Sequence, residues 1–261
     1  MKISVTIITF NEAENIKAAC ESAAWADEIL VVDSESTDAT REIAAGLGVK
    51  VLVKRWDGFS QQKQFAADQA QYDWILSLDA DERVSNELRE EILELKTQSS
   101  ENLLDGYKIP RRSFYMNRWI KGGGWYPDYQ LRFYNRRRGA WKKVLIHESV
   151  LMKPNAKVGI LKHDILHYSI PNASYHQRLI GERYAPLAAR QMFESGRRTT
   201  RLKIATAGLT SFLQTFILKG GWRDGLAGFC IARFAAHHAF LKHLLLWEMQ
   251  ENGKSKTENG K

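Results

Sequence analysis

The first hundred residues alternate short apolar runs with helical patterns, and this alternation limits the possible folds more than any other feature. The apolar runs cover residues 3–10, 28–33, 50–53 and 74–78. The helical patterns cover residues 14–24, 38–45, 60–70 and 86–95. Strands that alternate with helices of this length are typical of βαβ units and a doubly wound, mostly parallel sheet. The predicted fold class is therefore α/β.

Three of the apolar runs end in polar clusters, which are Thr9-Phe10-Asn11-Glu12, Asp33-Ser34-Glu35-Ser36-Thr37-Asp38 and Asp79-Ala80-Asp81-Glu82. Open α/β sheets bind ligands at the carboxyl ends of their strands. Asp79 and Asp81 are two residues apart on an extended backbone, so both could address one hard divalent cation. Alternatively, the acids belong to the start of the next helix, for which Ser85 is a suitable N-cap. No dinucleotide fingerprint or P-loop motif occurs at these turns.

Charge is distributed very unevenly along the chain. Residues 1–106 hold 10 Lys and Arg against 21 Asp and Glu, a net charge of −11, whereas residues 107–261 hold 28 against 9, a net charge of +19. A split of this kind predicts that the second part meets an anionic partner. Nucleic acid, an anionic membrane surface and a phosphorylated substrate are the candidates.

Cysteine use and the first residues both favour the cytoplasm. Cys20 and Cys230 are the only cysteines, which fits a reducing compartment, although one bridge between them remains compatible with the count. Residues 1–10 run directly into a polar segment, without the apolar length or the cleavage site of a signal peptide. We expect this segment to be the first strand.

The three strand-end clusters, in this order, resemble those of glycosyltransferase family 2, whose catalytic domain has the GT-A fold. Within that family the chain is similar to the lipopolysaccharide inner-core β-1,4-glucosyltransferases. The supporting segments are 58–63, 125–128, 131–134, Trp141, His147-Glu148 and 221–225. The resemblance implies an inverting, metal-dependent transferase that moves a hexose, expected to be glucose from UDP-glucose, onto a heptose of the lipopolysaccharide inner core.

The same resemblance implies roles for the strand-end residues. Thr9 and Glu12 would line the nucleotide pocket together with Phe10, Asn11, Ser34 and Ala80. Asp33 would accept from the uracil, Asp79 would contact the ribose or the sugar, and Asp81 would hold Mg²⁺ or Mn²⁺. A cation that bridges a carboxylate and both phosphates stabilises the charge of a departing diphosphate. Lys63 could contact the diphosphate, or it could be a solvated surface lysine.

The catalytic base has two candidates. The Glu-Asp pair usual in the family is replaced here by Pro127-Asp128, and Asp128 is the single acid between Asp105 and Glu148. Surrounding cations should keep Asp128 ionised and ready to accept the proton of the acceptor hydroxyl. The alternative for Asp128 is a structural ion pair with Arg132, in which case Glu148 would be the base.

Further residues are expected at the acceptor and the metal. His147 could contact the metal or the diphosphate, or could be an ordinary hydrogen-bonded histidine. Trp125 and Arg132 are expected at the acceptor, and Arg136, Arg137 and Arg138 would grip its phosphates or form a solvated turn. Gly122-Gly123-Gly124 is expected to be either a mobile joint in a substrate loop or a plain surface turn. The Q-x-x-R-W motif of processive members is missing, which favours one transfer per encounter.

From about residue 197 the pattern is helical again. The longest uncharged run, 204–218, has 15 residues, too few to span a bilayer. Its basic flanks suit either an anionic membrane interface or packing against its own domain. The expected divisions are a donor-binding half at 1–106, an acceptor-binding and catalytic half at 107–195, a helical region at 196–250 and a disordered tail at 251–261. We expect a cytoplasmic protein, peripheral at the inner face of the cytoplasmic membrane.

Three other functions fit parts of the sequence. A nucleic-acid-binding module would explain the basic second part, but the acidic strand ends would repel a polyanion. A nucleotidyltransferase would need a Gly-rich loop after the first strand, which is absent. A family 2 transferase that glycosylates a polyprenyl phosphate, or another envelope polysaccharide intermediate, fits the basic C-terminal region.

Overall fold

The computed structural model describes residues 1–99, 102–142 and 148–258 of the chain. These residues form two compact units. The first unit comprises Met1–Arg112 and Asp128–Ser169, and the second comprises Ser113–Pro127 and Ile170–Lys261. The division differs from the expected boundary at residue 106, because residues 107–112 and 128–169 add strands to the N-terminal sheet.

The N-terminal half of the first unit is the predicted βαβ array. Its elements are β1 (Ile3–Thr9), α1 (Ile16–Ser22), β2 (Glu28–Asp33), α2 (Thr40–Gly46), β3 (Lys50–Val53), α3 (Phe59–Gln69) and β4 (Trp74–Asp79). The strands β3, β2, β1 and β4 lie side by side in this order, and all three pairings are parallel. The α/β prediction is confirmed.

The other half of the sheet is mainly antiparallel. It contains β5 (Glu82–Val84), β6 (Gly106–Tyr115), β8 (Asp128–Asn135), β11 (Val158–Ile160) and β12 (Ile165–His167), and α4 (Asn86–Thr97) follows β5. The order continues from β4 through β8, β6 and β12 to β5. β8 runs antiparallel to both β4 and β6. A separate two-stranded sheet is formed by β9 (Gly139–Trp141) and β10 (Val150–Met152).

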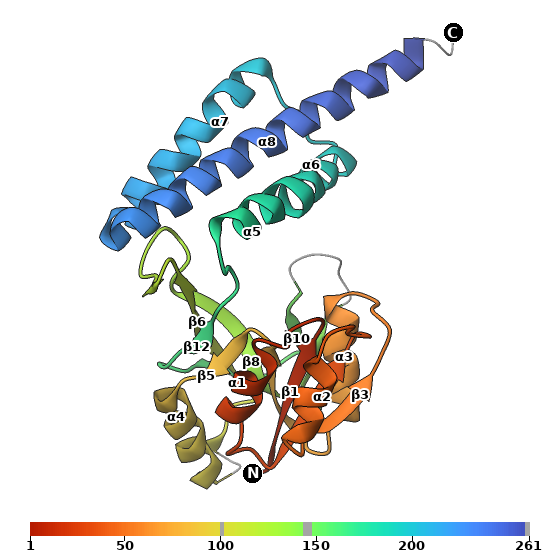
Figure 1. The fold of residues 1–261 in the computed structure, drawn as a ribbon, viewed down its shortest axis with the longest axis vertical. Coiled ribbons are helices and arrows are strands. Elements are labelled where there is room, and N and C mark those ends of the chain that lie inside the picture. Colours follow the sequence, from red (N-terminus) through yellow and green to blue (C-terminus); the bar gives the residue numbers. More distant parts are fainter. Residues whose placement is uncertain (100–101, 143–147, 259–261) are drawn as a thin grey trace. The chain divides into compact units, whose positions relative to one another are not determined.

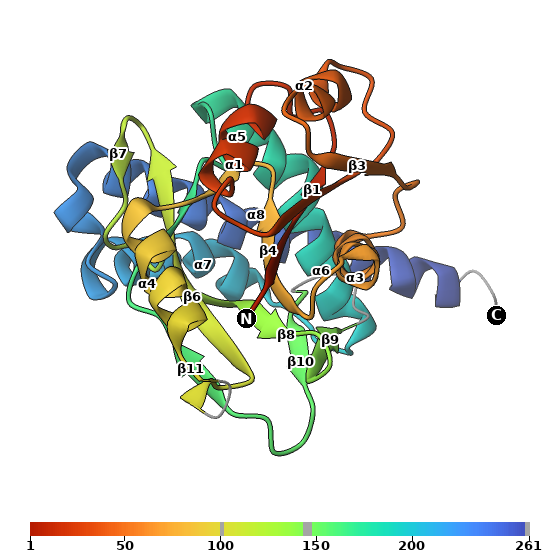
Figure 2. The same cartoon turned by 90° about the horizontal axis from the view of Figure 1, so that it is seen from below.

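The alternation of side chains along β1 builds a core on each face of the sheet. Ile3, Val5 and Ile7 pack with residues of α1, α2 and α4. Ile8 faces the other side, where α3 and Trp141 of β9 contribute to a second core. Helices therefore cover both faces of the parallel strands, and α2 and α3 are seen on opposite sides of β3 (Figure 2).

Ser85 caps α4 as predicted, because its Oγ accepts a hydrogen bond of 3.1 Å from the backbone N–H of Leu88. This bond satisfies one of the free donors at the helix start. The acids of the 79–82 cluster lie before this cap and are not first-turn residues of α4, whose first-turn acid is Glu87. The helix-capping interpretation of Asp79 and Asp81 is therefore wrong.

The second unit is mostly helical. Its elements are β7 (Arg118–Trp119), α5 (Ala173–Arg178), the π-helix η2 (Leu179–Tyr184), α6 (Ala185–Glu194), α7 (Arg201–Leu213), the π-helix η3 (Gln214–Leu218), the 3₁₀-helix η4 (Gly221–Asp224) and α8 (Gly225–Glu258). The long α8 packs between α7 and α6 (Figure 1). It continues through residues 251–258, where the sequence predicts a disordered tail. Among the described residues, no helix is long and apolar enough to cross a membrane.

The three-glycine segment is a tightly packed turn of the second unit. The N–H groups of Lys121 and Gly122 donate to the carboxylate of Asp224, which is fully buried. A Cβ atom on Gly122 would lie 2.3 Å from the carbonyl oxygen of Gly220. Glycine is required here by the close approach of two backbones. Neither a mobile joint nor a plain surface turn describes this segment.

Candidate active site

The three polar clusters meet at one edge of the sheet. Thr9 at the end of β1 is in register with Asp33 of β2, and Ile8 is in register with Asp79 of β4. Because the three strands are parallel, the loops that follow them leave the sheet on the same side. The sequence predicted that each cluster follows a strand of a mostly parallel sheet, whose carboxyl ends are where open α/β sheets bind ligands.

The first two loops are tied together by hydrogen bonds. The N–H of Asn11 donates to Ser36 Oγ at 2.8 Å, and Asn11 Oδ1 accepts from the N–H of Thr37 at 2.8 Å. The N–H of Glu12 donates to Thr40 Oγ1 at 2.8 Å. Asn11 has a φ of +53°, a conformation that asparagine tolerates better than most residues. The loops therefore form one connected rim, on which Phe10 is 54% exposed.

Asp33 and Ser34 lie below this rim. The Asp33 side chain is fully buried, and its carboxylate accepts hydrogen bonds from the N–H and the Oγ of Ser36. Ser34 Oγ accepts from Gln62 Nε2 at 2.8 Å. A uracil that bonded to Asp33 would have to compete with Ser36, so the role of Asp33 stays a prediction.

Asp79 is surrounded by cations. Its Oδ1 lies 2.9 Å from Lys63 Nζ, and its Oδ2 lies 2.9 Å from Arg132 Nη2. Burial raises the pKa of the Asp79 carboxyl, but the charges of Lys63 and Arg132 outweigh burial and hold this pKa far below its usual range. Asp79 is therefore ionised and already neutralised by protein groups.

Lys63 is a core residue and not a solvated surface lysine. Its side chain is 0% exposed, and its Nζ lies 3.1 Å from Glu148 Oε1 in addition to its contact with Asp79. The ammonium group also lies 5.1 Å from the ring centroid of Trp141, within cation–π range. A lysine is rarely buried without anionic partners, and here two carboxylates supply them.

Glu82 ends the 79–82 cluster, and no role was predicted for it from the sequence. It is fully buried, its Oε2 accepts from the N–H of Asp79, and its Oε1 accepts from Arg111 Nη1 at 3.0 Å and from Arg132 at 3.4 Å. Arg111 in turn binds Asp128. One unbroken ion-pair network therefore links seven side chains in the order Glu148, Lys63, Asp79, Arg132, Glu82, Arg111 and Asp128.

Asp81 differs from Asp79 in its surroundings. The Asp81 side chain is 22% exposed, and its Oδ2 lies 3.3 Å from His167 Nε2. The pKa of Glu12 is raised, first by burial and then by the negative charge of Asp81 among other acids. Two carboxylates and an imidazole therefore border a region of negative potential, which favours a cation.

A divalent cation fits this donor set only with further oxygen ligands. No group of three or more His, Cys, Asp or Glu in the described part of the chain is placed to hold a metal ion by itself. Mg²⁺ is commonly held by one or two carboxylates, with substrate phosphates completing its shell. Asp81, with its imidazole neighbour His167, fits this mode of binding.

His167 was missed by sequence reasoning, and His147, which was proposed instead, lies outside the described residues. β12 carries His167 beside β5, with His167 in register with Glu82 and the N–H of Tyr168 donating to the carbonyl of Asp81. A strand of three residues has no periodicity to reveal it. The sheet pairing alone brings His167 to Asp81.

Asp128 begins β8 at the same edge of the sheet. Its Oδ2 accepts from Arg111 Nε at 2.9 Å and Nη2 at 2.7 Å, and its Oδ1 accepts from Gln130. The structural alternative predicted an ion pair with Arg132, but Arg132 pairs with Asp79 and Glu82. Residues four apart are neighbours on a helix, whereas on a strand such as β8 they lie about 13 Å apart. The Asp128 side chain remains 34% exposed.

The residues expected at the acceptor are dispersed. Arg132 is only 4% exposed and is used by the network. Arg136 pairs with Asp73 and donates to a carbonyl of α3 and to that of the C-cap residue of α3. Arg137 also pairs with Asp73, and Arg138 pairs with Asp105. Because β8 runs antiparallel to β4, with Asn135 opposite Trp74, these three arginines lie at the far end of β4 from Asp79. At that distance from Asp79 they cannot bind the phosphates of an acceptor at the strand ends.

Trp125 belongs to the second unit. There it packs against Tyr115 and His176, with ring centroids 5.5 and 5.9 Å away. Its expected contact with the acceptor stays a prediction.

Residues 4–152, more than half of the chain, match the profile described as Glycosyl transferase family 2. The chain belongs to glycosyltransferase family 2. Its relatives in the family include the lipopolysaccharide core biosynthesis glycosyltransferase LpsC of Rhizobium meliloti, 32% identical over 92% of this chain and 90% of LpsC. An uncharacterized glycosyltransferase of Rickettsia bellii is also 32% identical, over 95% of this chain and 87% of that protein.

Among solved structures, residues 1–349 of Staphylococcus aureus TarS in complex with UDP-GlcNAc align at a TM-score of 0.49 and 14% identity, covering 97% of this chain and 92% of that one. Family membership, together with the sheet described above, makes the chain a glycosyltransferase with a GT-A-like fold. The resemblance drawn from the strand-end clusters is thereby confirmed at the level of the family.

Proposed function

We propose that this family 2 enzyme is an inverting, metal-dependent transferase that moves glucose from UDP-glucose onto a heptose of the lipopolysaccharide inner core. The observation that carries the proposal is the difference in surroundings between the two aspartates of the 79–82 cluster. Asp79 is neutralised by Lys63 and Arg132, whereas Asp81 faces His167 without a cation of its own among the described residues. The name of the Rhizobium meliloti relative supports the lipopolysaccharide core as the acceptor.

Each strand-end residue has a task in this proposal. Asp79, held ionised, accepts hydrogen bonds from the ribose or the donor sugar. Asp81 and His167 hold Mg²⁺ or Mn²⁺, and the rim that contains Thr9, Asn11 and Glu12 surrounds the nucleotide. When bound, the cation would stabilise the negative charge of the UDP leaving group.

Asp128 is the proposed base. The acceptor hydroxyl attacks the anomeric carbon from the face opposite UDP, the bond from this carbon to the diphosphate oxygen breaks, and Asp128 takes the hydroxyl proton. The products are the new glycoside with inverted configuration and UDP. Arg111 and Gln130 fix the orientation of the Asp128 carboxylate. The Asp128 side chain is 34% exposed, which leaves room for an acceptor. Glu148 is less suited, because its described hydrogen-bond partner is the fully buried Lys63.

The donor is tested by thermal unfolding with UDP-, GDP- and dTDP-sugars, each with Mg²⁺, Mn²⁺ or a chelator. A ligand that binds only the folded state raises the melting temperature. UDP-glucose with a divalent cation should give the largest increase, and Asp81→Asn should abolish the cation-dependent part. The exposed Glu90→Gln is the matched control and should behave as the wild type. An increase in Asp81→Asn that still depends on the cation would remove Asp81 from the metal site.

The base is tested by single-turnover transfer. Asp128→Asn should bind UDP-glucose normally and lose about 10² to 10⁴ in rate, the range for a positioned base. Wild-type turnover in Asp128→Asn, together with the same loss in Glu148→Gln, would assign the base to Glu148.

The acceptor is tested with purified lipid acceptors and labelled UDP-glucose. Label should enter lipopolysaccharide core that ends in heptose and lacks glucose. Label in polyprenyl phosphate instead would replace the proposed acceptor. The net charge of +19 over residues 107–261 supports a phosphorylated acceptor and a place at the inner face of the cytoplasmic membrane.

A further inference from the structure

The second unit exposes an unusual amount of apolar surface along α7, η3, η4 and the start of α8. We call this surface the apolar face, and define it as Leu202, Leu209, Leu213, Ile217, Leu218, Trp222, Leu226 and Phe229. Leu218 is 80% exposed, Leu202 73% and Leu226 68%. A single exposed leucine needs no explanation, but eight exposed apolar residues on consecutive elements indicate an interaction surface. The sequence is compatible both with packing of this region on its own domain and with binding to an anionic membrane interface.

The spacing of these residues places them on one side of the helix. Leu202, Leu209, Leu213 and Ile217 are separated by seven, four and four residues, which is a helical repeat. At about 100° per residue, the buried residues Ala207 and Thr215 fall on the opposite side of the same segment, which packs against α8 and η4. The segment therefore has a packed side and a second apolar side, which the described residues leave exposed.

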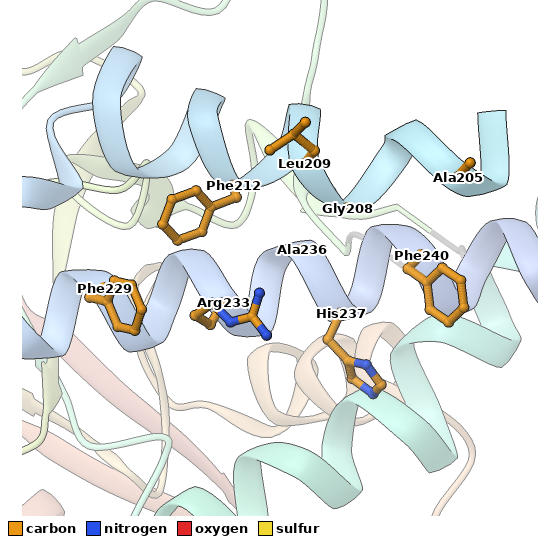
Figure 3. A pocket seen from close by; sticks show the side chains of 9 residues that line it. All are labelled: Ala205, Gly208, Leu209, Phe212, Phe229, Arg233, Ala236, His237 and Phe240. Atoms are coloured by element: carbon orange, nitrogen blue, oxygen red, sulfur yellow. The ribbon is translucent and has the colours of Figure 1, made fainter. Parts of the chain in front are cut away.

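A groove between α7 and α8 continues the apolar face. It has a volume of about 560 Å³ and is lined by Leu209 and Phe212 of α7 and by Phe229, Arg233 and Phe240 of α8, among others. Figure 3 shows the two helices side by side with these side chains along the groove between them. The lining is apolar apart from Arg233 and His237.

The charges around the apolar face are all of one sign. Residues 196–247 contain eight Lys and Arg and a single acid, Asp224. Asp224 is fully buried and accepts from backbone N–H groups, so it does not reduce the surface charge. The exposed cations on these elements are Arg201, Lys203, Lys219, Arg223 and Arg233.

We propose that the apolar face inserts into the surface of a bilayer that contains anionic lipid. The surrounding Lys and Arg side chains then contact the lipid headgroups, and the groove between α7 and α8 is open to an acyl chain. Apolar side chains flanked by cations are the combination that binds such an interface. A second copy of the chain is disfavoured as the occupant, because it would bring the same positive charge. The surface extends the proposed function, but it is defined without reference to donor or acceptor.

The test is sedimentation of the full chain with vesicles of phosphatidylcholine, with and without phosphatidylglycerol. The protein should bind the anionic vesicles at least tenfold more tightly than the neutral ones. The variant L209S/L213S/I217S should lose at least tenfold in affinity. Its control is L151S/I160S, which removes two similarly exposed apolar residues from the first unit, 66% and 61% exposed, and should bind as the wild type.

A second pair of variants tests the charges. R201Q/K203Q/K219Q should lose about fivefold in affinity per charge, since each cation near the surface contributes about that factor. The control K153Q/K162Q removes exposed lysines of the first unit and should change little. Circular dichroism and the melting temperature with UDP-glucose show whether each variant is folded.

Two results would overturn the inference. One is equal binding by L209S/L213S/I217S and L151S/I160S. The other is a dimer in equilibrium sedimentation that L209S/L213S/I217S dissociates, with no vesicle binding by the wild type, because the occupant would then be a second copy. Sugar transfer to a delipidated core oligosaccharide is measured separately. A failure to bind vesicles would therefore not contradict the proposed reaction, and a failure of sugar transfer would not contradict membrane binding by the apolar face.

Discussion

Replacing Lys63 with methionine tests whether the buried ion-pair network holds the site together. Methionine approximates the length of the lysine stem and can fill the same space, so the change removes mainly the charge. Lys63 Nζ lies 2.9 Å from Asp79 and 3.1 Å from Glu148, and its side chain is 0% exposed. The substitution therefore leaves two carboxylates without this cation.

The expected magnitude follows from the burial of these carboxylates. Removal of one partner from a buried ion pair typically costs about 3–5 kcal/mol. Asp79 keeps its contact with Arg132, and Asp79 and Glu148 are 23% and 24% exposed, so water offsets part of the loss. We expect the lower end, about 3 kcal/mol. For a chain of this size the melting temperature should fall by about 6–12 °C.

The penalty should also depend on pH. The pKa of Asp79 is raised by burial but lowered further by Lys63 and Arg132, so it lies below the unfolded value in the folded protein. A depressed carboxyl pKa stabilises the folded state above the unfolded pKa, near 4, and this stabilisation is lost as the pH falls. The difference between wild type and Lys63→Met should therefore be largest near pH 7 and shrink below about pH 4.

The assay is urea unfolding followed by circular dichroism at several pH values. Lys17→Met is the control, because Lys17 pairs with Glu21 on the surface and is 64% exposed; exposed pairs contribute little, so its midpoint should not move. A loss below about 1 kcal/mol in Lys63→Met, or a loss that is no smaller well below pH 4 than at pH 7, would refute the proposed network effect.

Three further predictions concern stability. Burial lowers the pKa of His176 to about 4, so the folded state favours the neutral ring. The stability of the folded protein is therefore undiminished by this group above pH 6.5 and decreases as the pH drops toward 4, by at most about 3 kcal/mol. The urea midpoint of His176→Phe should accordingly change less between pH 7 and pH 4.5 than that of the wild type. An equal change of the midpoint in both proteins would contradict this prediction. Gly122→Ala should lower the melting temperature by several degrees, because its Cβ would lie 2.3 Å from the Gly220 carbonyl oxygen; an unchanged value would mean that the two backbones separate easily. Ser85→Ala should destabilise the protein by about 1 kcal/mol in chemical unfolding through loss of the cap on Leu88, and a neutral effect would show that water replaces the cap.

The sequence alone determined the parallel half of the sheet and the edge at which its polar clusters lie. Apolar runs and helical periods are local properties, so they located β1 to β4 and the helices between them. Because parallel strands must end at one edge, the clusters after Thr9, Asp33 and Asp79 could be placed together without coordinates. The order of these clusters was also specific enough to indicate the family.

Only the tertiary structure decided how the charges of the site are paired. His167 reaches Asp81 through the pairing of β12 with β5, and Arg111 reaches Asp128 across β6 and β8. The antiparallel direction of β8 also places Arg136 at the end of the sheet opposite to Asp79. Strand pairing between distant segments depends on the whole sheet, and short strands carry no periodic signal. The residues that cluster around Asp79 and Asp81 were therefore visible in the sequence as charges, but not as partners.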